Sequence, residues 1–229
     1  MWRSITFGSC SALLVVGVTF GQGQRSPATP VAQERAAALV AQERAQAELD
    51  APKLMDVLGL KSGMSVADIG AGYGAMSVVL AKQLGGGQVF ATDIGEPQLA
   101  GIRESVRREG LTNVTVLEGA AASTNLPMAC CDAIFLRHVY HHIGAVEAFN
   151  KSLSASLKAG GRLAIIDFVP LPGSQLPDGV PLNRGGHGIP PNVVIEEMSA
   201  AGFRHGRTID KWPPDDKQPT YFLALFTKP

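Results

Sequence analysis

A glycine-rich turn between two acidic residues combines the side chains and spacing needed to bind a small charged ligand. The turn, residues 70–74 (GAGYG), has Asp68 two positions before it, and Asp93 follows at the end of the next apolar segment. Glycine lets the backbone turn tightly and approach a ligand closely. A carboxylate after the second strand can accept hydrogen bonds from ribose hydroxyls. The pattern therefore predicts a site for a nucleoside-containing ligand.

Asp68 helps to decide which ligand this is. The turn alone also fits the dinucleotide fingerprint G-x-G-x-x-G/A, with Ala75 in the last position. A buried carboxylate beside a pyrophosphate would be repelled and left with uncompensated desolvation. S-adenosylmethionine carries an ammonium and a sulfonium and no phosphate, so Asp68 favours it over NAD. Either acid alone could be an ordinary helix cap, and it is their combination with the glycines that points to a binding site.

Strands and helices that alternate along the chain must position these residues. Apolar runs between glycine-rich turns predict a doubly wound α/β domain, a mainly parallel sheet covered on both faces. A Pro/Asp loop joins the last two strands, which we expect to form an antiparallel hairpin at the sheet edge. Ligands of such sheets bind at the carboxyl ends of the strands. The predicted strands are Ser65–Ile69, Gln88–Thr92, Val114–Glu118, Ala133–Leu136, Arg162–Phe168, Arg204–Ile209 and Tyr221–Thr227, and the helices are Lys53–Leu60, Tyr73–Leu84, Pro97–Glu109, Ala145–Leu157 and Val193–Ala201.

Histidines gather after the fourth predicted strand and in a later glycine-rich segment. His138, His141 and His142 follow the strand, and His187 lies within residues 173–191, a segment that fits either an active-site loop or a disordered linker. Histidine titrates near neutral pH and can act as a general base. It can equally begin a helix or pack beneath a loop. We predict acceptor-side catalytic roles for His142 and His187.

Two further residues lie where strands are predicted to end. Asp167 ends the fifth predicted strand, and Arg137 follows the fourth. Because the carboxyl ends of parallel strands meet at one edge of the sheet, Asp167 is a candidate pocket residue and Arg137 a candidate for the cofactor cleft.

Over Asp50–Pro229 the sequence resembles the class I S-adenosylmethionine-dependent methyltransferases. Residues 68–74 (DIGAGYG) are similar to the family motif D/E-x-G-x-G-x-G, and Asp93 is similar to its ribose-binding acid. Residues 131–134 (CDAI) and 157–163 (LKAGGRL) resemble the family's fourth-strand motif and its turn into the fifth strand. The chain looks most like small-molecule methyltransferases related to the ubiquinone/menaquinone type.

This resemblance implies a seven-stranded sheet in the order 3-2-1-4-5-7-6, S-adenosylmethionine as cofactor and methyl transfer to a small-molecule acceptor. Two alternatives remain open at this point, a catalytically silent methyltransferase fold that binds a ligand or partner, and an NAD-dependent oxidoreductase. The residues implied in cofactor binding are Asp68, Gly70, Ala71, Gly72, Asp93, Ile94 and Arg137.

The segment after the third predicted strand departs from the family pattern. Relatives often carry an acid there that contacts the adenine amino group, whereas this chain has Glu118 followed by Gly-Ala-Ala-Ala. Adenine recognition then falls to backbone groups or to Ser123, Thr124 or Asn125. The missing carboxylate removes one charge-assisted hydrogen bond, about 1.5–3 kcal/mol, and favours the silent-fold alternative.

The first 49 residues divide into three segments. Met1–Gly21 has one cation, Arg3, before a short apolar run, which is the layout of a secretory signal peptide. A linker over residues 22–30 and a helical spacer over 31–49 follow, the spacer built on a direct repeat (VAQERA) without a single apolar face. We therefore expect export or tethering to a membrane by this segment, with a cytoplasmic protein as the alternative, and one domain over residues 50–229.

Composition excludes several classes of protein. Twenty basic and twenty acidic residues give a net charge of zero, which lacks the basic footprint of nucleic-acid binding. Three cysteines without a C-x-x-C spacing exclude a zinc module and a disulfide framework, and no metal site is expected. The adjacent Cys130 and Cys131 are predicted to be buried thiols, because a bond between them closes a strained eight-membered ring.

Overall fold

Seven strands form one sheet in the computed structural model, which describes residues 30–214 and 221–229. Their order is β3-β2-β1-β4-β5-β7-β6, as the family resemblance implied. Neighbouring strands are parallel except at β7, which runs antiparallel to both β5 and β6, so the predicted edge hairpin is confirmed. The strands are β1 Val66–Ile69, β2 Val89–Asp93, β3 Val114–Glu118, β4 Cys131–Arg137, β5 Leu157–Phe168, β6 Arg204–Ile209 and β7 Tyr221–Thr227.

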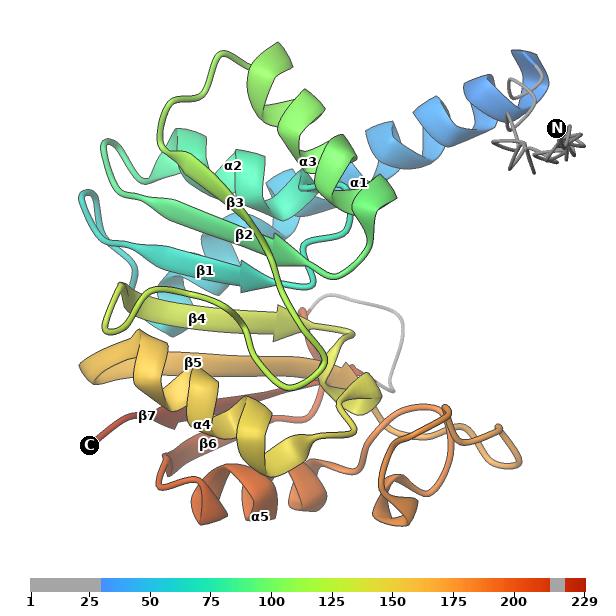
Figure 1. Cartoon of the computed structure of the whole chain (residues 1–229), viewed down its shortest axis with the longest axis vertical. Helices are drawn as coiled ribbons and strands as arrows, with labels where there is room; N and C mark the ends of the chain where they lie inside the picture. Colours follow the sequence, from blue (N-terminus) through green and yellow to red (C-terminus); the bar gives the residue numbers. More distant parts are fainter. Residues whose placement is uncertain (1–29, 215–220) are drawn as a thin grey trace, which may run out of the picture.

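Helices cover both faces of this sheet (Figure 1). Alternate residues of β4 divide between the two layers, as a strand buried on both sides requires. Ala133 and Phe135 pack with α1 and α2, whereas Ile134 and Leu136 pack with α4 and α5. The helices are α1 Pro30–Leu58, α2 Ala75–Gln83, α3 Glu96–Arg108, α4 Val146–Ser156 and α5 Pro191–Ala200, and two short 3-10 segments are η1 Tyr140–His142 and η2 Leu182–Arg184.

The first helix differs from the prediction. The sequence predicts a spacer that ends at residue 49 and a separate helix from Lys53, but α1 runs without a break through Pro52. Its second half packs into the core through Ala47, Leu54 and Leu58. Proline lacks the donor for one intrahelical hydrogen bond but does not end this helix, because packing of the following turns against the sheet outweighs that loss.

The start of β5 also differs from the prediction. We expected the strand to begin at Arg162 after a turn, but it begins at Leu157, which pairs with Cys131 of β4. The pairing then shifts register between Cys131 and Ala133, and the Gly160–Gly161 step lies within the strand. Extra residues of this kind are typical of β-bulges. The segment that resembles the family's turn therefore lies in an irregular first part of β5.

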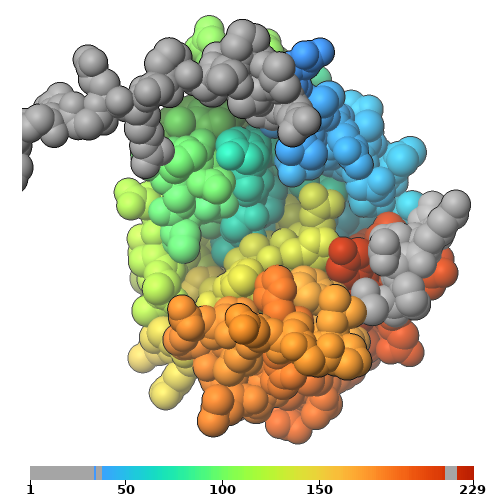
Figure 2. All heavy atoms as spheres, turned by 90° about the vertical axis from the view of Figure 1, so that its right-hand side faces the viewer, coloured from blue at the N-terminus to red at the C-terminus, as the bar shows by residue number. Residues whose placement is uncertain are grey.

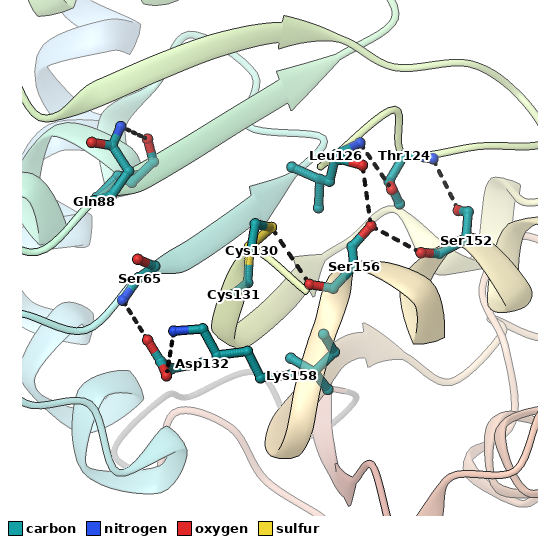
Figure 3. Close-up of a disulfide and its surroundings, with 12 residues drawn as sticks. Ser65, Gln88, Thr124, Leu126, Cys130, Cys131, Asp132, Ser152, Ser156 and Lys158 are labelled. Atoms are coloured by element: carbon teal, nitrogen blue, oxygen red, sulfur yellow. Dashed lines mark hydrogen bonds and ion pairs between the residues drawn. A yellow bond between two sulfur atoms is a disulfide. The ribbon is translucent and has the colours of Figure 1, made fainter. Parts of the chain in front are cut away.

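Cys130 and Cys131 form a disulfide, so the prediction of buried thiols is wrong (Figure 3). Sequence reasoning favoured thiols because of the strain in the eight-membered ring, whereas the two cysteines close that ring where the chain enters β4. Nearby, Asp132 accepts hydrogen bonds from the Ser65 amide at 2.8 Å and from Lys158 Nζ at 2.9 Å. This group lies at the amino end of β4, opposite the edge where ligands of such sheets bind.

The predicted signal peptide and the linker over residues 22–30 lie outside the described residues, apart from Pro30, which begins α1. Among the helices that the structure describes, none combines the length and apolarity needed to span a membrane.

Candidate active site

The carboxyl ends of β1, β2 and β4 meet at one edge of the sheet. This edge faces the viewer in Figure 2, where the surface is hollowed between the helices of the first half of the chain and the segment that follows β5. A pocket of about 430 Å³ opens here. It is lined by Gly70 after β1, by Asp93 at the end of β2 and Ile94 after it, and by parts of residues 119–124 and 139–143.

Gly70 gives the first strand its turn. Its φ of +70° lies in the left-handed region, and a Cβ at this position would collide with the side chain of Val139. The amides of Gly70 and Ala71 both donate to the carbonyl of Thr92, at 2.8 and 2.9 Å. The turn is thus held against the end of β2, and a side chain larger than hydrogen is excluded at its first position.

Asp93 is held by main-chain amides at the pocket wall. Its Oδ2 accepts from the Gly72 amide at 3.0 Å, and its Oδ1 accepts from the amides of Ile94 at 2.8 Å and Gly95 at 3.1 Å. An ionised carboxylate has about four acceptor positions, so it can still receive a ligand hydroxyl. The carboxylate is therefore fixed in place by the same turn that forms the pocket.

Asp68 lies beneath the wall of this pocket rather than on it. Its side chain is buried, and Oδ2 accepts a hydrogen bond from Ser77 Oγ in the first turn of α2 at 2.6 Å. Burial raises the pKa of Asp68 to about 6, against the lowering effects of the Ser77 hydroxyl and the Arg137 guanidinium. Its predicted contact with a cationic ligand stays a prediction, since Asp68 is not among the residues that line the pocket.

The other residues predicted to bind the cofactor divide into two groups. Ile94 lines the pocket, while Gly72 and the neighbouring Ala71 belong to the turn that supports it. Arg137 instead lines an adjacent pocket between α1 and the ends of β4 and β5, where its guanidinium lies 3.9 Å from Asp50 Oδ2.

The segment after β3 supplies backbone groups and two hydroxyl residues to the pocket wall, and their role in adenine recognition stays a prediction. Gly119, Ala120 and Ala121 line the pocket with Ser123 and Thr124. A bridge between Ala120 and Ser123 closes this segment into a small loop. Asn125 is not part of the wall and donates instead to the carbonyl of Glu118 at 3.0 Å.

Three histidines come together beside the pocket. One nitrogen of each of His141, His142 and His187 lies within 4.8 Å of the others. His141 is buried, and its Nδ1 lies 2.8 Å from Oδ1 of Asp167, a side chain with no exposed surface. His141 Nε2 lies 3.2 Å from His187 Nε2. The structure therefore brings together both predicted acceptor-side histidines with Asp167, which contacts His141 and does not line the pocket.

His142 joins the two parts of the site. Its side chain lines the pocket that also holds Asp93. Burial, reinforced by the charges of His141 and His187, lowers the pKa of His142. His138 has a different place, because it stacks on Tyr221 with ring centroids 4.6 Å apart and borders the neighbouring pocket with Arg137.

A buried ion pair that sequence reasoning missed fixes the two segments that carry the histidines. Arg184 has no exposed surface, and its Nη1 donates to Glu197 Oε1 at 2.6 Å, while its Nη2 donates to the carbonyl of Ile143 at 3.3 Å. The hydroxyl of Tyr140 donates to Glu197 Oε2 at 2.8 Å. Glu197 therefore binds both η1 and η2 to α5. An arginine directly before two glycines was the available signal, but its distant partner was not visible in the sequence.

Comparisons with known proteins identify methyltransferases as relatives of this chain. Residues 67–165 match the family model described as a methyltransferase domain. The ubiquinone/menaquinone biosynthesis C-methyltransferase UbiE of Yersinia pestis is 28% identical over 116 residues, which is 50% of this chain and 46% of that protein. The chain thus spans about half the length of the curated relatives that it matches.

A solved S-adenosylmethionine-dependent methyltransferase from Aquifex aeolicus has 27% identity and a TM-score of 0.65, over 83% of this chain and 97% of that one. This match extends over nearly the whole length of that protein. The chain carries a class I S-adenosylmethionine-dependent methyltransferase domain.

A phosphoethanolamine N-methyltransferase of Haemonchus contortus, solved with S-adenosylmethionine, shares the fold of this methyltransferase domain. Its TM-score is 0.61 at 17% identity, over 77% of this chain and 51% of that one. S-adenosylmethionine is the cofactor of this family. The order of the strands also separates this domain from the dinucleotide-binding fold. That fold has the order 3-2-1-4-5-6, whereas here an antiparallel β7 lies between β5 and β6. This order opposes the oxidoreductase alternative.

Proposed function

We propose that this protein transfers the methyl group of S-adenosylmethionine to a small-molecule acceptor. The observation that carries the proposal is the pocket at the ends of β1 and β2, where three backbone amides hold the Asp93 carboxylate. That arrangement suits the ribose hydroxyls of a nucleoside. The resemblance to methyltransferases of known cofactor supports the same ligand.

The charge of the pocket wall also suits a cation better than a phosphate. Among the described residues that line it, Asp93 is the one carboxylate, and neither lysine nor arginine is present. A pyrophosphate would lie beside a carboxylate without a cationic side chain to balance it, a costly arrangement in a partly desolvated pocket. The sulfonium of S-adenosylmethionine has the opposite sign and is attracted to it.

The reaction itself asks little chemistry of the protein. A lone pair of the acceptor attacks the methyl carbon, the carbon–sulfur bond breaks, and its electron pair stays on sulfur to give neutral S-adenosylhomocysteine. The protein aligns the reactants and excludes water. If the acceptor atom carries a proton, that proton must also leave, and His142 on the pocket wall and the adjoining His187 are the groups we assign to the acceptor side.

A silent methyltransferase fold is the second candidate, and the segment after β3 favours it. Ala120 stands near the position where relatives often carry the adenine-binding acid. A site that has lost one charge-assisted hydrogen bond binds the nucleoside more weakly by about 1.5–3 kcal/mol. Under this candidate the domain binds a ligand or partner and transfers no methyl group.

A labelled-methyl transfer screen tests the proposal. The purified chain is incubated with S-adenosylmethionine labelled in its methyl group and with metabolite extract from the source cell. Asp93→Ala serves as the site variant, and Asp56→Ala, which changes an exposed acid on α1, serves as its control. We expect label in a small organic product with the native chain and with Asp56→Ala, and a large reduction with Asp93→Ala. Cofactor binding without any labelled product would favour the silent fold.

We also propose that the N-terminal segment exports or tethers the protein, with a cytoplasmic protein as the alternative. The single cation and short apolar run of Met1–Gly21 support this proposal. Fusing the segment to a reporter that is active only outside the cytoplasm tests it. Reporter activity that disappears when charged residues replace the apolar run is the expected result, and an inactive fusion of normal abundance contradicts it.

A further inference from the structure

We propose that His141, His142 and His187 bind one divalent cation of the zinc type, with Asp167 orienting His141. The three residues each offer a ring nitrogen, and these nitrogens lie within 4.8 Å of one another. Imidazole nitrogen is a preferred ligand of zinc and of neighbouring transition metals. The inference stands on this geometry and goes beyond the proposed methyl transfer.

The spacing of the imidazoles suits a shared ion. His141 Nε2 and His187 Nε2 are 3.2 Å apart. Two nitrogens at about 2.0–2.1 Å from a tetrahedral zinc ion lie about 3.3–3.4 Å from each other. The two imidazoles are therefore separated almost as two ligands of one ion would be, and His142 needs only a small movement to join them.

Asp167 fixes the tautomer that a metal ligand requires. Its Oδ1 lies 2.8 Å from His141 Nδ1, and Oδ2 accepts the amide of His141 at 3.1 Å. An ionised carboxylate can only accept, so Nδ1 carries the proton and the lone pair of Nε2 points at His187. Carboxylate–histidine–metal arrangements of this kind are the usual second layer of a zinc site.

A hydrogen bond between two histidines explains less of the cluster. His187 could donate from Nε2 to His141 Nε2, which accounts for the 3.2 Å separation. It does not account for the third imidazole, because His142 lies with its ring 3.9 Å from that of His141 and 5.5 Å from that of His187, measured between centroids. Contacts between the rings do not require one nitrogen of each to converge, whereas a shared cation does.

The site is rigid on one side and open on the other. The Arg184–Glu197 pair and the Tyr140 hydroxyl hold the two segments that carry the histidines. His142 and His187 remain exposed. Three protein ligands with an open fourth position are typical of catalytic rather than structural zinc.

The histidine cluster adjoins the cofactor pocket, since His142 lines that pocket too. In a part of the inference that rests on the proposed function, an acceptor with a hydroxyl or thiol group would coordinate there. A bound metal lowers the pKa of such a group, so its proton would pass to bulk water, and His142 and His187 would act as metal ligands in place of the base. This predicts an alcohol, a phenol or a thiol as the acceptor class.

Metal titration of the full chain tests the site. After treatment with a chelator, the chain is titrated with Zn²⁺ in competition with a coloured chelator, and Co²⁺ is added separately to record its visible absorption. The variants are His142→Ala and His187→Ala, and the matched control is His205→Ala, whose imidazole lies in β6 and contacts Thr208. Asp167→Asn serves as the positioning variant. Circular dichroism and thermal unfolding report whether each variant is folded, and S-adenosylmethionine affinity is measured separately.

We expect one Zn²⁺ per chain for the native protein and for His205→Ala. Each ligand variant should lose on the order of 100-fold in affinity and the tetrahedral Co²⁺ spectrum, and Asp167→Asn should lose about 10–100-fold. If folded His142→Ala and His187→Ala bind Zn²⁺ as tightly as the native chain, the site is overturned. Zinc binding without S-adenosylmethionine binding would support the site and contradict the proposed function, and the reverse result would contradict the site alone.

Discussion

The two halves of the cleft are built from different parts of the chain. The cofactor half uses backbone amides and one carboxylate from a single unit, the segment from β1 to the start of α3. The histidine half uses side chains from three segments, η1, the end of β5 and the loop before α5. The cofactor half should therefore depend on backbone conformation and on Asp93, whereas the histidine half should depend on the long-range contacts that hold its segments together.

The largest effect is expected from breaking the clamp of the histidine half. Arg184→Ala leaves Glu197 without its buried partner, so the free energy of unfolding should fall by about 3–5 kcal/mol. Arg107→Ala is the matched control, because it breaks an exposed pair with Glu104 that contributes at most about 1 kcal/mol. Urea unfolding measures both. Equal losses for the two variants would show that the clamp adds nothing beyond a surface ion pair.

A pH-dependent effect is expected from Asp68, which supports the cofactor half. Its pKa is raised from 3.8 to about 6 in the folded chain, so the folded state binds the proton more tightly than the unfolded state does. Its contribution to stability is therefore lost as pH rises from about 4 to about 6, by about 3 kcal/mol in total.

Asp68→Asn removes this titration while keeping an acceptor for the Ser77 hydroxyl. The stability of the native chain relative to this variant should fall across that pH range and stay level above it. Unfolding free energies measured at several pH values check the prediction. Two curves that remain parallel would mean that Asp68 does not titrate in the folded chain as described.

A smaller effect, confined to ligand binding, is expected from Asp93. Asp93→Ala should weaken S-adenosylmethionine binding by about 1.5–3 kcal/mol, which is roughly 10–150-fold. Zinc affinity should not change, since the carboxylate belongs to the other half of the cleft. Calorimetry with each ligand measures both quantities, with Asp56→Ala as the control. A parallel loss of zinc binding would contradict the separation into two halves.

The smallest effect is expected within the glycine turn. Gly72 has a φ of +56° and open space where a Cβ would lie. Gly72→Ala should therefore cost about 1 kcal/mol of backbone strain and little more. Gly70→Ala should cost more, because its Cβ also meets Val139. Thermal unfolding compares the stability of the two variants. A larger loss of stability for Gly72→Ala than for Gly70→Ala would contradict this ranking.

The sequence predicts the features that nearby residues determine and misses those that distant contacts determine. β3, β6 and β7 begin and end at the residues that the sequence predicts. The Gly70 turn and Asp93 were found because a βαβ unit keeps its ligand-binding residues within about 30 residues of chain. The boundaries of α1 and β5 were missed because packing of α1 against the sheet and pairing of Leu157 with β4 decide them.

The histidine half could be predicted only in part. His142, His187 and Asp167 were each singled out, but nothing in their spacing indicated that His141 would join Asp167 to His187. That contact follows from the register of β4 on β5, where Arg137 pairs with Ile166 and so brings the following residues to Asp167. Arg184 was missed for the same reason, since its partner Glu197 lies on another element.

The central claim is that the cofactor half binds S-adenosylmethionine. Calorimetric titration of the full chain with S-adenosylmethionine, S-adenosylhomocysteine and NAD tests it most directly. The account predicts one site for each of the first two ligands, weakened by Asp93→Ala, and no heat of binding for NAD. Binding of NAD alone would contradict it.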